Sequence, residues 1–237
     1  MIVLSMYPQE MHNQLVSDAE KVQYMMSKRR SNATRVFRKA KSFPAWYVDE
    51  FEIPSSKNKY VLFYYACNMR EIEHPQYVHF CIVSDDNNRY VIKGMQIKHK
   101  TSPESEALWL PQIHSYTSHF LQRYSERFLH NEELSANEIA GMYFLRNPQP
   151  LLISINEEIN RNFQKYGEFN NGVRVDDGFC FAQTEIFCEK DIDKNKAADG
   201  MLIVYRTFLN LLDMSDAQRE AINKVCLESI KRCKEEF

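Results

Sequence analysis

Residues 114–130 place imidazole, guanidinium and carboxylate groups at the spacing of a helix. His119, Arg123 and Arg127 recur at steps of four residues, so on an α-helix they lie on one face, one turn apart. Paired arginines present forked donors that suit the oxygen atoms of a phosphate. An imidazole one turn away exchanges a proton near neutral pH. The pattern therefore predicts an anion-binding surface next to His119.

The same spacing also fits an ordinary amphipathic helix. Its apolar side would consist of the aromatic and aliphatic residues Phe120, Leu121, Tyr124 and Phe128. The two arginines would then pair with Glu126 and with a neighbouring acid, as exposed helical residues usually do. From helix statistics alone this second interpretation is the more frequent one, so both stay open.

Neither a metal ion nor a cofactor is predicted. His119 and His130 would lie about 16 Å apart along a helix axis, and His114 points to another side of the helix. The six cysteines form no Cys-x-x-Cys pair, and a zinc knuckle requires such pairs. The six glycines lie at least five residues apart, which excludes a Walker A loop and a Rossmann turn.

A second group of basic residues lies near the N-terminus. The segment 21–41 contains no acidic residue and eight basic ones: Lys21, Lys28, Arg29, Arg30, Arg35, Arg38, Lys39 and Lys41. Such a run is usually a solvated face, and the alternative is a second phosphate contact. The net charge of −2 argues against a protein that coats nucleic acid without specificity.

The first half of the chain predicts one long helix and four strands. Apolar residues recur at helical spacing over residues 8–30, and a short basic helix is expected over 34–41. Runs rich in Val, Ile, Tyr and Phe, separated by turn residues, predict strands at 46–53, 60–67, 77–84 and 89–96. Their short, even spacing favours an antiparallel meander.

The second half predicts helices followed by strands. Helices are expected over 111–129, 135–145 and 155–166, the second of them opened by the capping box Ser135-x-x-Glu138. Asp176-Asp177-Gly178 predicts a hairpin between strands 173–175 and 179–186. A buried strand at 201–209 and a final helix from Asp216 complete the chain.

These elements predict an α+β protein in two parts, each an antiparallel sheet with packed helices. Residues 1–98 form the N-terminal helix and the four-stranded meander, and residues 105–237 form the second part. The polar segment 98–108 is the expected joint between them.

Residues 112–210 resemble the small RelE/BrnT-like toxin families, whose helices precede a curved antiparallel sheet. The motifs that carry this resemblance are the helix pattern His119-x-x-x-Arg123-x-x-x-Arg127, the capped helix at Ser135-x-x-Glu138-Ile139, the Asp177-Gly178 hairpin and the strand Leu202–Thr207. The resemblance implies RNA cleavage without a metal ion, in which a 2′-hydroxyl attacks the adjacent phosphate. It assigns catalytic roles to His119, Arg123 and Arg127, and more loosely to Arg206.

Two functional hypotheses follow. In the first, a toxin-like domain binds RNA or another phosphate ligand, or acts as a ribonuclease, through the His119 helix face. In the second, the protein is a non-catalytic module that binds a protein partner. No stretch of about 18 apolar residues is present, so no membrane contact is expected. The absence of a secretory signal predicts a cytoplasmic protein with reduced thiols.

Overall fold

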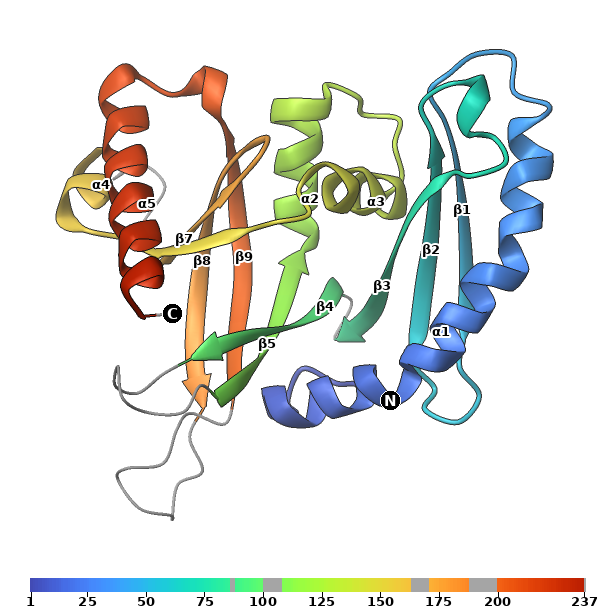
Figure 1. The fold of residues 1–237 in the computed structure, drawn as a ribbon, viewed down its shortest axis with the longest axis horizontal. Coiled ribbons are helices and arrows are strands. Elements are labelled where there is room, and N and C mark those ends of the chain that lie inside the picture. The colour runs from blue at the N-terminus through green and yellow to red at the C-terminus, as the bar shows by residue number, and fades with distance from the viewer. Residues whose placement is uncertain (86–87, 100–107, 163–170, 188–199, 237) are drawn as a thin grey trace.

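One mixed sheet of nine strands runs through the whole protein (Figure 1). The computed structural model describes residues 1–85, 88–99, 108–162, 171–187 and 200–236. The strands are β1 (Ala45–Glu52), β2 (Lys59–Ala66), β3 (Gln76–Asp85), β4 (Asn88–His99), β5 (Leu108–Thr117), β6 (Leu151–Ser154), β7 (Asn171–Val175), β8 (Gly178–Phe187) and β9 (Gly200–Asn210). Their order in the sheet is β1-β2-β3-β4-β5-β9-β8-β7-β6.

Five α-helices and three shorter turns accompany the sheet in the part of the chain that the structure describes. The helices are α1 (Pro8–Phe37), α2 (Ser118–Tyr124), α3 (Ala136–Arg146), α4 (Glu157–Asn162) and α5 (Asp216–Glu236). The turns are the 3₁₀ segments η1 (Met69–Glu71) and η4 (Leu211–Asp213) and the π-helical η2 (Ser125–Leu129). Among the described residues, no helix is both long and apolar enough to cross a membrane.

The predicted division into two separate antiparallel sheets is wrong. Two antiparallel groups of strands do exist, but β5 of the first pairs in parallel with β9 of the second, from Gln112–Met201 to Tyr116–Tyr205. This central pair joins both groups into one sheet. The β4 and β5 strands, on either side of the predicted joint, also pair with each other from Tyr90–Thr117 to His99–Leu108, while residues 100–107 lie outside the described part.

The first third of the predicted helix 111–129 is a strand. β5 lies at the centre of the sheet and is buried on both faces, with Ile113 fully buried and Tyr116 2% exposed. A strand of this kind lacks the alternation of polar and apolar residues that marks a half-exposed strand. In the sequence, the apolar residues of β5 therefore continue the apolar pattern of α2, and the two elements together were predicted as one long helix.

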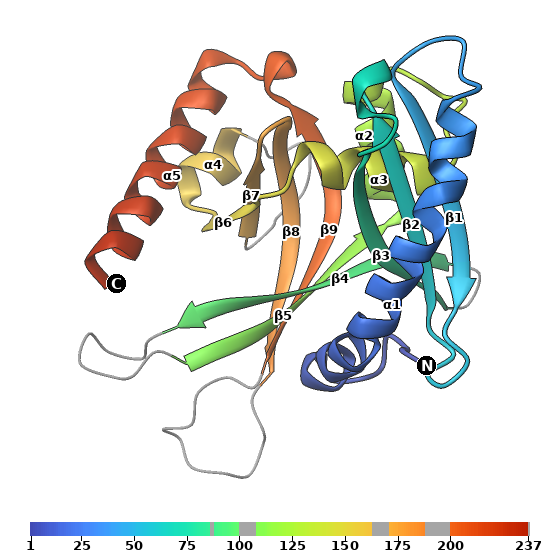
Figure 2. The ribbon, with the colours of Figure 1, turned by 45° about the vertical axis from the view of Figure 1, so that its right-hand side comes forward.

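The two faces of the sheet carry different helices. Val61 of β2 belongs to a core that contains residues of α2 and α3, whereas its neighbours Tyr60 and Leu62 pack into a core with α1. Because successive strand residues point to opposite faces, α1 covers one face, and α2 and α3 cover the other. Figure 2 shows these helices on the two sides of β2 and β3. A third core joins β8 to α4 and α5.

Most other predicted elements are confirmed. The four strands of the meander, the hairpin at Asp177-Gly178, strand β9 and the final helix lie where expected. In α3, Ser135 and Glu138 form the predicted capping box. The predicted break near residue 31 is wrong, since α1 continues to Phe37. The predicted helix 155–166 is seen as α4, its residues 163–166 lie outside the described part, and the short strand β6 was not predicted.

Candidate functional site

Helix α2 starts where β5 leaves the sheet and is held beside β9 from its first residue. Thr117 caps the helix, because its Oγ1 accepts a hydrogen bond from the backbone N–H of Phe120 at 3.1 Å. The same hydroxyl donates to the carbonyl oxygen of Tyr205 at 3.1 Å. The cap therefore fixes the base of α2 against β9. Figure 1 shows α2 continuing from the end of β5, beside β9.

The last turn of this helical segment is π-helical. Residues Ser125–Leu129 form η2, which contains Arg127. A π-turn holds one more residue per turn than an α-helix and occurs often at functional sites. The turn ends at His130, whose φ of 51° is left-handed. His130 therefore leaves the helix, whereas an unbroken α-helix would have kept it on the face of Arg123 and Arg127.

A bulge in β9 accommodates Arg206. Phe181 of β8 pairs with Thr207, and the next residue, Ala182, pairs with Tyr205, so Arg206 is the extra residue. Bulges of this kind bend a strand and redirect a side chain. The guanidinium group of Arg206 donates to Gln183 of β8, whose neighbour Ala182 belongs to the core that contains α2 and α3, so Arg206 lies on the opposite face, which is also the face of α1.

The Thr117 cap, the π-helical turn and the bulge in β9 bring together all four residues predicted as catalytic. His119, Arg123, Arg127 and Arg206 line one pocket with a volume of about 510 Å³. The other lining residues come from the start of β4, the end of β5, the start of α2 and the bulge: Asn88, Arg89, Tyr90, Thr117, Ser118 and Thr207. We call this the arginine pocket. It is the concave site that the helix spacing could only suggest.

The charge of the arginine pocket is predominantly positive. Arg123 pairs with Glu126 on its own helix at 2.7 Å, and this bond lowers the pKa of the Glu126 carboxyl. Arg206 donates to the neutral Gln183 Oε1 at 2.8 and 3.2 Å. Arg127 donates to the hydroxyl of Thr207 and to the carbonyl of Phe208. Among the described residues that line the pocket, four are arginines and none is acidic, an excess of positive charge that suits a dianionic or polyanionic ligand.

Two further residues of the arginine pocket, His119 and Arg89, differ in their surroundings. The imidazole of His119 is exposed at the pocket. The guanidinium of Arg89 donates to Asn137 of α3, and its backbone carbonyl accepts from the hydroxyl of Ser118 at 2.9 Å. No cluster of three metal-ligating residues exists among the described residues.

Sequence reasoning missed the polar residues that surround the arginines. Tyr90, Thr117 and Ser118 line the pocket because β4 pairs with β5 up to Tyr90–Thr117. That pairing was hidden, since residue 108 was assigned to the joint and residues 111–117 to a helix. The Thr117-x-x-Phe120 cap was the one local signal, a Ser/Thr-type start before an apolar helix.

A buried histidine lies in the sheet next to the pocket. His114 of β5 is 3% exposed, and its Nδ1 lies 2.9 Å from the hydroxyl of Tyr205 while its Nε2 lies 3.2 Å from Gln112 Oε1. Burial lowers the pKa of His114 to about 3, and the charge of Lys93 adds to this effect. The imidazole is therefore neutral at physiological pH and orders the central strands rather than the pocket.

Comparisons with known proteins add nothing to this geometry: no family model matches the chain, no curated protein matches its sequence, and no solved structure matches its fold. The resemblance of residues 112–210 to the RelE/BrnT-like families stays a prediction. Function is therefore inferred from the arginine pocket.

Proposed function

We propose that the protein binds RNA, with a phosphate group of the strand held in the arginine pocket. The observation that carries this proposal is the convergence of Arg123, Arg127 and Arg206 on one concave surface from two elements distant in sequence. Forked donors from several directions match the tetrahedral oxygen atoms of a phosphate. The half-buried Tyr90 at the pocket offers an aromatic ring against which a base stacks.

The amphipathic-helix interpretation explains less of this arrangement. It expects the arginines to be neutralised by acids of the protein, and Glu126 does so for Arg123. Arg206 has no carboxylate within 4 Å among the described residues, and its partner Gln183 is neutral. Bulges are frequent next to active sites, where they redirect a side chain, and this one lies at a residue that lines the pocket.

The binding test compares variants that remove charge at the pocket. Fluorescence anisotropy with a labelled single-stranded RNA, between about 50 and 200 mM salt, measures both the affinity and its salt dependence. Arg206→Gln and Arg123→Gln should each weaken binding about fivefold or more and reduce the salt slope by about 0.7 to 1. Arg219→Gln on α5 is the matched control and should bind like the wild type. Equal affinity of all four proteins would contradict the proposal.

Cleavage of the bound RNA is a second candidate, favoured by His119 at the same pocket. In this reaction the 2′-oxygen attacks phosphorus, the bond to the 5′-oxygen breaks, and a 2′,3′-cyclic phosphate forms. One group accepts the proton of the 2′-hydroxyl and another protonates the 5′-oxygen, while the arginines stabilise the negative charge on the non-bridging phosphate oxygen atoms. His119 supplies one of the two proton-transfer groups.

Incubation with total RNA in the presence of a chelator tests cleavage. Degradation by the wild type, together with its loss in His119→Ala, supports a role for the imidazole. Intact RNA with both proteins would remove cleavage and leave binding as the function. A cytoplasmic location belongs to this proposal, and Cys67, Cys81, Cys180 and Cys226 are free thiols, as a reducing compartment requires.

A further inference from the structure

A basic groove lies along the second half of α1. It has a volume of about 640 Å³, and α1 with the residues just after it provides every lining residue except Glu73, which follows η1. We call it the α1 groove. Its cationic residues are Arg30, Arg35, Arg38 and Lys39. They face the single carboxylate of Glu73, so the groove carries an excess of positive charge.

Hydroxyl and guanidinium groups alternate along this groove. Ser27, Arg30, Thr34 and Arg38 recur at steps of three or four residues, which places them on one face of the helix. A row that combines guanidinium and hydroxyl donors follows the repeating phosphate and sugar oxygens of a nucleic-acid strand.

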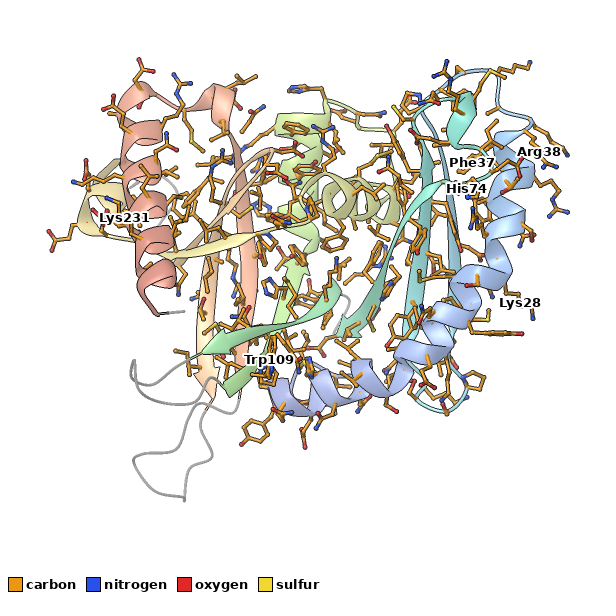
Figure 3. The ribbon with its side chains drawn as sticks, viewed as in Figure 1. Lys28, Phe37, Arg38, His74, Trp109 and Lys231 are labelled. Atoms are coloured by element: carbon orange, nitrogen blue, oxygen red, sulfur yellow. The ribbon has the colours of Figure 1, made fainter. Side chains whose placement is uncertain are left out.

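The loop after η1 holds the groove in shape. Arg38 donates to Glu73 Oε1 from Nη2 at 2.7 Å and from Nε at 3.0 Å. Arg30 donates to the backbone carbonyl of Glu73, and its Nη2 lies 2.7 Å from His74 Nδ1. Figure 3 shows Arg38 and His74 together near the end of α1, with Lys28 projecting from the outer side of the same helix. These contacts fix two cations without neutralising the whole groove.

Two ordinary explanations of the basic run are insufficient. Cations stabilise the C-terminal end of a helix, but this effect is confined to the last turn, and Lys21, Lys28, Arg29 and Arg30 lie before it. Structural ion pairs account for Arg29 with Asp49 and for Arg38 with Glu73. Within the described part of the chain, Arg30, Arg35 and Lys39 have no carboxylate at ion-pair distance, and both Arg35 and Lys39 are exposed.

The α1 groove and the arginine pocket belong to the same side of the sheet. Arg206 donates to Gln183 on the face opposite the core of α2 and α3, and Tyr90 of the arginine pocket packs against the core that α1 covers. A strand held in the pocket can therefore extend toward α1 without crossing an edge of the sheet.

We propose that the α1 groove binds the sugar–phosphate backbone of the same RNA strand, several nucleotides away from the phosphate held in the arginine pocket. This inference rests on the proposed function and adds that the ligand is an extended single strand rather than a mononucleotide. The concave shape of the groove favours a strand over a membrane surface, which is flat on this scale. Guanidinium groups also predominate over ammonium groups, as is typical of phosphate recognition.

The test compares RNA length with the site that is altered. Single-stranded RNAs of about 4 and about 20 nucleotides bracket the length that one site of this kind binds. The double variant Arg35→Gln/Lys39→Gln changes two exposed residues that make no contact with Glu73 in the described structure. It should bind the long RNA about tenfold more weakly, with a salt slope smaller by about 1.4, and bind the short RNA unchanged. Lys231→Gln, an exposed change on α5, should leave both affinities unchanged.

The results separate this inference from the proposed function. Arg206→Gln should weaken binding of both RNAs, because the arginine pocket is used by each. If Arg206→Gln has no effect while the double variant weakens the long RNA, the groove binds RNA and the pocket does not. Wild-type affinity of the double variant for the long RNA would overturn the inference, and so would the absence of RNA binding by the wild type.

Co-sedimentation with phosphatidylcholine vesicles containing about one-fifth phosphatidylserine tests whether the α1 groove binds an anionic membrane instead. Vesicle binding that depends on Arg35 and Lys39, without an effect on RNA, would also overturn it.

Discussion

Arg127 and Phe208 join the π-helical turn to the strand segment after the bulge, because the guanidinium group of Arg127 donates a hydrogen bond to the backbone carbonyl of Phe208. Asn210 completes the link in the other direction, since its Nδ2 donates to the carbonyl of Arg127 at 2.9 Å. Arg127 therefore has two roles, as part of the lining of the arginine pocket and as a contact between η2 and β9. Arg206 is exposed and contacts only Gln183 by hydrogen bonds in the described structure.

We therefore predict that substitution of Arg127 and substitution of Arg206 change the free energy of unfolding by different amounts. Arg127→Met should lower the free energy of unfolding by about 1–3 kcal/mol, because the Phe208 carbonyl loses a charged donor in a half-buried setting. Arg206→Met should change it by less than about 0.5 kcal/mol, as is usual for an exposed side chain. Urea denaturation followed by circular dichroism measures both values. Equal destabilisation by the two variants would contradict the structural role of Arg127.

Local signals in the sequence predict the ends of elements well. Ser135 with Glu138 forms the expected cap, and Ser215 with Gln218 forms a cap of the same kind, with hydrogen bonds of 2.8 Å to the N–H of Ser135 and 3.0 Å to the N–H of Ser215. These interactions span three residues, so their geometry depends on the local sequence alone. The β5 strand could not be predicted in this way, because its burial on both faces depends on pairing with β9 about 90 residues later.

In the candidate site, too, the features set by local sequence were predictable, and those set by distant packing were not. The spacing of His119, Arg123 and Arg127 along one helix is visible in the sequence. The position of Arg206 beside them depends on a bulge in β9, and that of Arg127 depends on a π-turn. Neither device has a sequence signature that is independent of tertiary packing. The resemblance placed Arg206 among the site residues before any geometry supported it.

Asp177 is the centre of a buried polar cluster that we predict to be important for stability. It accepts hydrogen bonds from Tyr124 at 2.6 Å and from Asn147 at 3.0 Å, and it pairs with Arg146 at 2.8 Å. Its side chain is 6% exposed, whereas that of Arg146 is 50% exposed. Asp177→Ala should lower the free energy of unfolding by about 2–4 kcal/mol, since two buried donors lose their acceptor.

Tyr124→Phe provides the graded comparison for this cluster. It removes one hydrogen bond to a charged acceptor and leaves the ring in place, so a loss of about 1.5–3 kcal/mol is expected. The double variant should be less destabilised than the sum of the two single variants, because both remove the same bond. Additive effects in chemical denaturation would show that the two side chains act independently.

The buried His114 predicts a loss of stability in acid. Its pKa in the folded protein is about 3, lowered by burial and by Lys93, whereas the unfolded chain has the ordinary value of about 6.5. Between these two values the unfolded state binds the proton and the folded state does not. The free energy of unfolding should therefore fall as the pH drops below about 6.5, by up to about 1.4 kcal/mol per pH unit for this group.

His114→Gln isolates that contribution from the other histidines. Burial also lowers the pKa of His12 and of His79, so the wild type alone reports a sum of similar effects. Urea denaturation of both proteins from about pH 7.5 to 4.5 gives the difference in stability at each pH. The advantage of the wild type should shrink steadily below about pH 6.5. A difference that does not vary with pH would mean that His114 takes up its proton in the folded protein.

Gly141 predicts an unusual outcome for a glycine inside a helix. Replacing a helical glycine by alanine normally stabilises a protein by about 1 kcal/mol. A Cβ atom on Gly141 would, however, lie 2.2 Å from Cγ of the fully buried Phe63, so α3 and β2 would have to separate. Overpacking of this kind costs about 1–3 kcal/mol, and because the clash is with a ring that has no room to move, we expect the cost to exceed the gain.

Gly141→Ala should therefore lower the thermal midpoint of unfolding by several degrees. Phe63→Leu in the same chain should recover part of that loss, since it removes the ring that the new methyl group meets. A higher midpoint for Gly141→Ala alone would show that α3 packs less closely on β2 than this contact requires.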